Sequence, residues 1–317
     1  MTGARRVLVT GASGFIGRWS VPALLASGFE VHAAVSDSHG GPMPDELRGA
    51  EVHRSDLLRE EAIDALLQLI RPTHLLHFAW IARPGEYWHS ADNFRWLSAS
   101  EYLLRRFHAA GGRRVVIAGS CAEYDWSGTG LCDEYATRLA DDASAATPAY
   151  AACKLRLQRF LAEFSARHRV SSAWGRIFFQ YGPNEHPERL VPSVIRNLLR
   201  DREALCTHGR QVRSFLHVAD VGAAFAAMLD AQVEGPVNVG SDERITLAEL
   251  IERIAAKIGR ADLVRLGARA ASAEPPLLIP ATRRLREETA WRPRFSLDEG
   301  LSDTIDWWRD RLAAAAP

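Results

Sequence analysis

Several features that would direct this 317-residue chain to particular partners are missing from its sequence. Its 39 basic and 39 acidic residues give a formal net charge of zero, so nothing indicates a surface for nucleic acid or for an anionic membrane. No apolar run approaches the length that spans a bilayer. Arg5 and Arg6 precede an apolar stretch, but the Gly17-Arg18 pair interrupts it, and a strand and turn explain it better than a signal peptide does.

Cysteine and lysine are both scarce. The four cysteines form no C-x-x-C pair and have no histidine-rich neighbourhood, so we expect no metal site and reduced thiols in a cytoplasmic protein. Only Lys154 and Lys257 among the 39 basic residues are lysines. Because the chain otherwise uses arginine, each lysine is a candidate for a specific role. The cysteines are Cys121, Cys132, Cys153 and Cys206.

Glycine, by contrast, is placed at regular intervals near the N-terminus. A β-rich run over residues 7–10 leads into Gly11-Ala-Ser-Gly14-Phe-Ile-Gly17, after which apolar residues recur at helical spacing. Gly11 permits a sharp turn, Gly14 lets a phosphate approach the backbone, and Gly17 lets the helix pack closely on the strand. This strand–turn–helix context predicts a dinucleotide cradle, with the diphosphate at the helix N-terminus.

The end of the next strand bears on the choice between NAD and NADP. An acidic side chain there would bind the 2′-hydroxyl of the adenosine ribose and repel a 2′-phosphate. The position falls at Val35 or Ser36, and neither is acidic. Ser36 could donate to a 2′-phosphate and Arg18 could neutralise it, which favours NADP(H). Asp37 follows directly and would serve NAD(H) instead, so both cofactors stay open.

Strands and helices are expected to alternate through the first half of the chain. This pattern predicts an α/β fold with a doubly wound, Rossmann-like parallel sheet, whose ligand edge lies beyond the C-terminal ends of the strands. We expect a dinucleotide-binding domain over residues 1–180, to which later helices can return. A smaller mixed α/β substrate lobe is expected over 181–317. Expected strands cover 29–35, 51–53, 73–78, 114–118 and 170–179, and expected helices cover 60–70, 90–110, 148–168, 193–200, 218–230, 247–258 and 297–312.

A candidate catalytic trio follows from this layout. Tyr150 and Lys154 are four residues apart on an expected helix, so they share a face, and Ser120 ends the strand beside it. A tyrosine ionises near pH 10, and a neighbouring ammonium favours the phenolate and lowers that pKa. Ser120 can hydrogen-bond the reacting oxygen. A tyrosine and a lysine at this spacing also occur by chance as packing residues. The glycine turn and the strand-end serine favour a catalytic role for this pair.

With these residues in place, the chain resembles the extended short-chain dehydrogenase/reductase family, in particular its nucleotide-sugar epimerase, dehydratase and ketoreductase members. The resemblance covers nearly the whole length. Its motifs are the glycine turn, Asp56-Leu57, His77-Phe-Ala-Trp80, Gly119-Ser120-Cys-Ala-Glu-Tyr124, Tyr150-Ala-Ala-Cys-Lys154, Arg176-Ile-Phe-Phe-Gln-Tyr-Gly-Pro183, Arg213-Ser-Phe-Leu-His-Val-Ala-Asp220, Asn238-Val-Gly-Ser-Asp-Glu-Arg-Ile-Thr-Leu247, Trp291-Arg-Pro293 and Leu297-Asp-Glu-Gly300.

The resemblance implies roles for individual positions. Ser120, Tyr150 and Lys154 match the catalytic trio, and Lys154 would also hold the nicotinamide ribose. Arg213 matches an arginine that pairs with the substrate diphosphate, although it could equally be a surface arginine before a buried strand. Cofactor-binding positions are then Gly11, Ser13, Gly14, Phe15, Ile16, Gly17, Arg18, Ser36, Asp56, Leu57, Phe78, Ala79, Tyr150, Lys154 and Ile177. Substrate-binding positions are Trp80, Cys121, Ala122, Phe179, Leu190, Val191 and Arg213, with Pro192 also bordering the nucleotide base.

Departures from the family pattern narrow the chemistry. Sugar 4,6-dehydratases resemble Thr-Asp-Glu-x-Tyr where this chain has Cys121 and Ala122 in place of the acid and base, and alanine cannot transfer a proton. Epimerase-reductases that make fucose nucleotides carry a cysteine at the place of Ala122, one residue away from Cys121. The family's substrate-binding asparagine is Phe179, which indicates a less polar sugar pocket, such as one for a deoxysugar.

Together these observations predict an NAD(P)H-dependent enzyme that reduces the C4 keto group of a nucleotide-linked, 6-deoxy hexose. A C4 epimerase with tightly bound NAD is the close alternative, because it uses the same trio. A dinucleotide-sensing protein without chemistry is a further one, although such proteins usually lose the tyrosine or lysine that this chain keeps. We expect a cytoplasmic protein with a nucleotide-diphosphate sugar as its partner, and the family resemblance suggests a homodimer.

Overall fold

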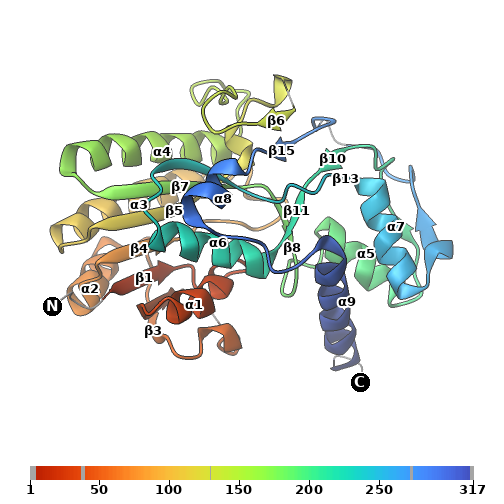
Figure 1. The fold of residues 1–317 in the computed structure, drawn as a ribbon, viewed down its shortest axis with the longest axis horizontal. Coiled ribbons are helices and arrows are strands. Elements are labelled where there is room, and N and C mark those ends of the chain that lie inside the picture. Colours follow the sequence, from red (N-terminus) through yellow and green to blue (C-terminus); the bar gives the residue numbers. More distant parts are fainter. Residues whose placement is uncertain (1–4, 37–39, 129, 272–273, 315–317) are drawn as a thin grey trace.

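The largest element of the fold is a sheet of seven parallel strands (Figure 1). A computed structural model describes residues 5–36, 40–128, 130–271 and 274–314. The strands lie in the order β12-β7-β5-β4-β1-β2-β3, so the direction of winding reverses between β1 and β4. Ligands of such sheets bind at this switch point. The strands are β1 (Arg6–Thr10), β2 (Glu30–Val35), β3 (Glu51–Arg54), β4 (His74–His77), β5 (Arg114–Ser120), β7 (Ser171–Ile177) and β12 (Gly235–Val239).

Helices cover both faces of this sheet because its central strands are apolar on both sides. Val7 and Val9 of β1 belong to one buried cluster, and Leu8 belongs to the other. Since side chains alternate along a strand, each cluster lies on its own face. The first face carries α1 (Gly17–Ala26), α6 (Val218–Asp230) and α8 (Arg283–Thr289), and the second carries α2 (Glu60–Ile70), α3 (Asp92–Ala109) and α4 (Ala149–His168). The predicted doubly wound α/β fold is confirmed.

A separate apolar cluster organises the smaller lobe, which lies at the other end of the molecule in Figure 1. It joins α5 (Leu190–Leu198), α7 (Leu247–Ile258) and α9 (Leu297–Ala314). Short strand pairs connect them: β8 (Phe179–Tyr181) with β11 (Phe215–His217), β9 (Ala204–Leu205) with β14 (Val264–Arg265), and β10 (Val212–Arg213) with β13 (Ile245–Thr246). β6 (Leu131–Cys132) and β15 (Ile279–Pro280) form a further pair, and single turns are η1 (Asp45–Leu47), η2 (Cys121–Glu123), η3 (Trp126–Gly128) and η4 (Ala261–Leu263).

Most expected elements are present, and the main differences concern α5, α8 and the strand expected over residues 170–179. Helix α5 begins at Leu190, three residues earlier than expected, because Pro192 is tolerated in the first turn of a helix. Helix α8 was not expected, since only Leu285 of its seven residues is buried and no apolar stripe indicates it. The strand expected over 170–179 is divided into β7 and β8.

The chain returns to the first layer after residue 181. α6 packs on α1 so closely that a Cβ on Gly222 would lie 2.4 Å from the carbonyl carbon of Trp19. β12 pairs with β7 at the edge of the large sheet. The division of the chain at residue 180 stays a prediction.

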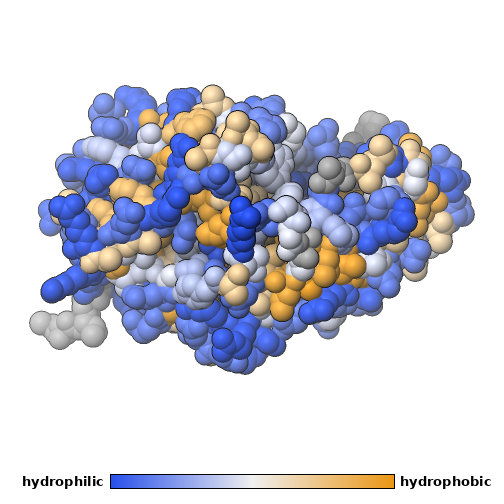
Figure 2. Space-filling view, turned by 90° about the horizontal axis from the view of Figure 1, so that it is seen from above, coloured by the Kyte–Doolittle hydropathy of each residue, from blue (hydrophilic) through white to orange (hydrophobic). Residues whose placement is uncertain are grey.

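In the part of the chain that the structure describes, no helix is both long and apolar enough to cross a bilayer. Seen from above, hydrophilic residues cover most of the surface and apolar residues form separate patches (Figure 2).

Candidate active site

The glycine turn after β1 leaves no room for a side chain at positions 11 and 17. Gly11 has a φ of +65°, and a Cβ there would lie 2.8 Å from the amide nitrogen of Ala79. A Cβ on Gly17 would lie 2.3 Å from the carbonyl oxygen of Gly11. These contacts agree with the sharp turn and the close helix packing that the spacing predicts. Helix α1 then directs its N-terminus toward the turn, where a diphosphate would bind.

Arg18 folds back onto this turn. Its Nε donates to the carbonyl of Gly14 at 3.1 Å and its Nη2 to the carbonyl of Ser13 at 2.7 Å. Burial lowers the pKa of the guanidinium, and the charge of Glu46 opposes that shift. Arg18 therefore stabilises the turn in addition to any contact with a cofactor. Phe15 and Ile16, at the tip of the turn, are partly buried.

A buried histidine fixes the two strands at the switch point. Thr10 Oγ1 and His77 Nδ1 are 2.6 Å apart, and His77 Nε2 lies 2.9 Å from Ser100 Oγ. Burial lowers the pKa of His77 to about 3, helped by the charge of Lys154, so the imidazole is neutral. The Ala79 amide donates to Thr10 Oγ1 at 3.3 Å. This network holds Ala79 beside the glycine turn.

The remaining predicted cofactor residues lie at or just beyond the same strand ends. Ser36 follows β2 and is exposed, whereas Asp37 lies outside the described residues. The Asp56 carboxylate accepts from the Leu58 amide at 3.1 Å, and Leu57 is buried. Phe78 packs edge-on against Phe225, with ring centroids 4.9 Å apart, and Ile177 ends β7 in a buried position.

The structure brings Ser120, Tyr150 and Lys154 together. Tyr150 and Lys154 lie in the first turns of α4, and the Ser120 hydroxyl at the end of β5 is close enough to Tyr150 to affect the pKa of its phenol. Lys154 is 3% exposed, and its Nζ lies 5.9 Å from the centre of the Tyr150 ring. That ammonium donates to the Ala118 carbonyl at 2.9 Å and lies 3.9 Å from the centre of the Trp80 indole.

The expected effect of Lys154 on Tyr150 is not observed. Burial raises the pKa of Tyr150, and the nearby Ser120 hydroxyl opposes this shift. Burial also lowers the pKa of Lys154 to about 7, against the charge of Glu123. The reason is that desolvation disfavours both charged forms, while the ammonium is directed at Ala118 and Trp80. In this structure Ser120, not Lys154, is the group that favours the phenolate.

Glu123 positions Ser120 and was not predicted as a site residue. It accepts hydrogen bonds from the Ser120 amide at 2.7 Å, from Trp174 Nε1 at 2.9 Å and from Arg176 Nε at 2.8 Å. Glu123 and Arg176 form an ion pair with side chains 0% and 1% exposed. Cys121, two residues before Glu123, is buried, and burial raises the pKa of its thiol to about 12. Glu123 falls in the Gly119–Tyr124 motif, which is the signal that could have identified it.

Two aromatic residues pack against Tyr150, and a third packs against one of them. Its ring centroid lies 4.9 Å from that of Tyr87 and 5.8 Å from that of Trp88, and Trp126 lies 5.8 Å from Trp88. The Tyr150 amide donates to the Trp88 carbonyl at 3.1 Å. We call Tyr87, Trp88 and Trp126 the aromatic wall. The unusually aromatic and irregular stretch over residues 80–89 was the sequence signal for Tyr87 and Trp88, and nothing in the sequence indicated Trp126.

Asn93 connects this wall to the trio. It is fully buried, accepts from Trp80 Nε1 at 2.8 Å and donates to the Tyr87 carbonyl at 2.7 Å. Trp80 in turn contacts the Lys154 ammonium. One amide therefore holds both Tyr87, which packs against Tyr150, and Trp80, which contacts Lys154.

The predicted substrate residues extend from this point into the smaller lobe. Phe179 begins β8, and Arg213 lies with its guanidinium carbon 5.1 Å from the Phe179 ring centre. Arg213 is 1% exposed, and its Nη2 donates to Glu274 at 3.0 Å. Leu190 and Val191 begin α5. In this structure the charge of Arg213 is neutralised by a carboxylate of the chain itself.

One group of potential metal ligands lies away from the site, on strands β2 and β3. His32, Glu51 and His53 bring ligand atoms within 4.8 Å of one another, and the two imidazoles are 3.1 Å apart. The expectation of a protein without a metal stays a prediction.

Comparisons with known proteins agree with this geometry. The model of the "NAD dependent epimerase/dehydratase family" matches residues 7–240. The chain is 29% identical to a 3-diazoavenalumate denitrifying reductase from Streptomyces sp, over 87% of this chain and 84% of that protein. It is 26% identical to a dTDP-glucose 4,6-dehydratase from Streptomyces niveus, over 97% and 94% of the two chains. Among solved structures, the UDP-glucose 4-epimerase of Thermus thermophilus in complex with NAD superposes with a TM-score of 0.81 at 26% identity, covering 96% of this chain and 99% of that one.

Proposed function

Because the chain belongs to the NAD dependent epimerase/dehydratase family, of the extended short-chain dehydrogenase/reductase type, we propose that it reduces the C4 keto group of a nucleotide-linked 6-deoxy hexose. That it is an NAD-dependent oxidoreductase-type enzyme of a nucleotide-sugar family follows from the relatives. The observation that carries the finer proposal is a proton donor, Tyr150 with Ser120, without a second acid or base at Cys121 and Ala122.

The roles of the residues follow from their positions. When bound, the nicotinamide cofactor supplies the hydride that C4 receives. Tyr150 gives its proton to the C4 oxygen, and Ser120 hydrogen-bonds the same oxygen. Lys154 would hold the nicotinamide ribose, and the tight turn at Gly11 and Gly17 fits a diphosphate that needs close backbone approach.

Dehydration needs further proton transfers that this site does not supply. Elimination of water requires one group to remove a proton and another to protonate the leaving hydroxyl. The pKa of Cys121 is raised to about 12, so the thiol stays protonated and is a poor base at neutral pH, and Ala122 carries no titratable group. The reductase named among the relatives supports the idea that this scaffold hosts net reduction.

A C4 epimerase is the second candidate, favoured by the similarity to the Thermus thermophilus epimerase. An epimerase must release the keto sugar from one orientation and let it rotate before the hydride returns. Tyr87 and Trp88 pack against the Tyr150 ring, and we infer that they limit the space for such rotation. That enclosure favours the reductase, whose ketone needs a single orientation.

For the cofactor we propose NADP(H), with NAD(H) as the alternative. The strand end at Ser36 lacks an acidic residue, and Arg18 lies next to the turn where it can reach a 2′-phosphate. Some solved relatives, such as the Thermus thermophilus epimerase, were determined with NAD, so the cofactor preference is to be measured for this chain.

The test is a panel of nucleotide-linked 4-keto-6-deoxy hexoses assayed with NADPH and with NADH. We expect stoichiometric loss of absorbance at 340 nm and a C4 alcohol by NMR, with NADPH used more efficiently. Tyr150→Phe is the matched control, since it keeps the ring and removes the donor. The protein could instead be purified with bound NAD and convert the nucleotide hexose without added reduced cofactor. That result would show that the enzyme is an epimerase and not a reductase. Absence of both reactions across the panel would contradict the proposal.

We also propose a cytoplasmic homodimer that binds a nucleotide-diphosphate sugar and no nucleic acid. Light scattering of the purified protein, at concentrations near those in the assay, would give the mass that checks the dimer.

A further inference from the structure

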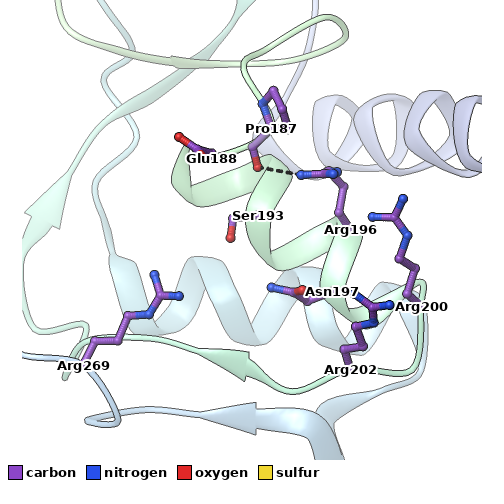
Figure 3. A pocket seen from close by; sticks show the side chains of 8 residues that line it. All are labelled: Pro187, Glu188, Ser193, Arg196, Asn197, Arg200, Arg202 and Arg269. Atoms are coloured by element: carbon purple, nitrogen blue, oxygen red, sulfur yellow. Dashed lines mark hydrogen bonds between the residues drawn. The ribbon is translucent and has the colours of Figure 1, made fainter. Parts of the chain in front are cut away.

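A cavity of about 460 Å³ in the smaller lobe gathers an excess of positive charge (Figure 3). Its charged lining consists of Arg196, Arg200, Arg202, Arg269 and a single carboxylate, Glu188. None of these lining residues belongs to the trio or to the glycine turn. Figure 3 shows Arg269 on one side of the cavity and Arg200 and Arg202 on the other, with α5 between them.

These four guanidinium groups form no ion pair with a described carboxylate. The acidic residues beside them are engaged elsewhere: Asp201 pairs with Arg260, and Glu203 pairs with Arg265 at 2.8 Å. Arg196 donates to the Pro187 carbonyl at 3.1 Å, but its buried Nε has no partner among the described residues. What distinguishes these arginines is that four of them line one cavity, together with a single carboxylate.

The cavity offers the donors that a phosphate requires. Guanidinium groups bind phosphate oxygens bidentately, and charge-assisted hydrogen bonds of this kind are strong. Ser193 and Asn197 add a hydroxyl and an amide on the same stretch of α5. The volume lies in the range of small-molecule sites. A ligand with one negative charge would leave most of the four groups without a partner, so the lining favours a polyanion.

The position of the cavity relates it to the substrate. Leu190 and Val191, expected to border the nucleotide base, begin the helix that carries Ser193 one turn later and Asn197 two turns later. The geometry points to a second anion site, which binds a phosphate-bearing group beyond the nucleotide base and apart from Arg213. This inference rests on the proposed function for the placement of the nucleotide. The phosphate belongs either to the substrate nucleotide itself or to a separate phosphorylated effector.

The first experiment measures binding of pyrophosphate by titration calorimetry at constant ionic strength, with the protein saturated with NADPH. We expect saturable binding to the wild type and affinity weaker by about tenfold or more in Arg200→Gln/Arg269→Gln. Both side chains are exposed, so the fold should persist, and a thermal melt checks this. Arg167→Gln, which changes an exposed arginine of α4, is the matched control and should bind like the wild type.

Three results would overturn the site: no binding to the wild type, equal affinity in the wild type and the double variant, or complete loss on Arg213→Gln alone. The last would place pyrophosphate at Arg213. None of these measurements requires turnover. A negative result with the keto-sugar panel would therefore contradict the proposed function, while pyrophosphate binding at the cavity is judged from the calorimetry alone.

Kinetics then separate the two sources of the phosphate. If the group belongs to the substrate, pyrophosphate should compete with it, and the double variant should raise KM with kcat unchanged. If it belongs to an effector, pyrophosphate should change kcat at saturating substrate in the wild type and not in the double variant. Kinetics that are the same for both proteins, with and without pyrophosphate, would contradict either assignment.

Discussion

The surroundings of Ser120 and the arginine cavity of the smaller lobe use arginine side chains in opposite ways. Arg176, behind Ser120, is buried and has its charge matched by Glu123 at 2.8 Å. Arg200 and Arg202 border an open cavity and have no carboxylate partner among the described residues. A buried charge must be paired because desolvation is costly, whereas an exposed one stays hydrated until a ligand arrives. At these two places, pairing within the chain accompanies the burial of Arg176, and its absence accompanies the exposure of Arg200 and Arg202.

The largest effect should come from the group that performs the chemistry. Tyr150→Phe removes the proton donor and leaves Lys154 and the glycine turn in place. We expect kcat to fall by about 10²–10⁴-fold with little change in cofactor affinity. Lys154→Ala should lower kcat and weaken the cofactor together, and Lys154→Arg should not restore either fully, because a guanidinium lacks the compact geometry of the ammonium. Near-normal turnover by Tyr150→Phe, measured on the true substrate, would show that another group donates the proton.

The contrast between the two kinds of arginine can be tested with one type of substitution at two places. Arg176→Met leaves Glu123 charged and buried, so the free energy of unfolding should fall by about 3–5 kcal/mol. The same change at exposed Arg200 should stay within about 0.5 kcal/mol. Urea denaturation of both variants gives the comparison. Similar losses at the two positions would mean that pairing does not distinguish them.

Glu185 differs from Arg176, because it is a buried acidic residue that forms no ion pair with a described residue. One of its carboxylate oxygens, Oε2, is buried and has no hydrogen-bond partner among the described residues, and burial raises its pKa to about 8. Between about pH 4.5 and pH 8 the folded state keeps this proton and the unfolded state does not, so stability falls as pH rises through that window.

Glu185→Gln should remove this dependence and stabilise the protein by roughly 2–4 kcal/mol relative to the wild type at about pH 8. Near pH 4.5 the two proteins should differ little. Urea unfolding at both values checks this prediction. A difference between the proteins that does not change with pH would exclude Glu185 as its source.

The smallest effect concerns the cofactor. Arg18→Ala should weaken NADPH by about tenfold if the guanidinium partly desolvates against the 2′-phosphate, and by less if it stays exposed. NADH should lose less, since only the support of the Ser13 and Gly14 carbonyls disappears. Fluorescence titration of both cofactors measures the ratio. Equal losses for NADPH and NADH would remove the argument for NADP(H).

Sequence by itself determined the parts of this protein that depend on neighbours along the chain. Helical and strand periods are local, so the bounds of α2, α6 and α7 were predicted to the residue. Turn chemistry is local as well: Gly11 needs a positive φ whatever surrounds it. The shared face of Tyr150 and Lys154 follows from helical geometry alone.

Only the tertiary structure decided the interactions between distant segments. Glu123 and Arg176 meet because β5 and β7 are neighbours in the sheet. Trp126, in the short turn η3, packs edge-on against Trp88, which lies almost forty residues earlier in the chain. The arginine cavity needs residue 269 to lie beside α5. The direction of the Tyr150 pKa shift also depended on packing, since burial outweighs the opposing effect of the Ser120 hydroxyl. Sequence specifies which charges exist, but desolvation and pairing depend on the folded surroundings, and these set what each charge does.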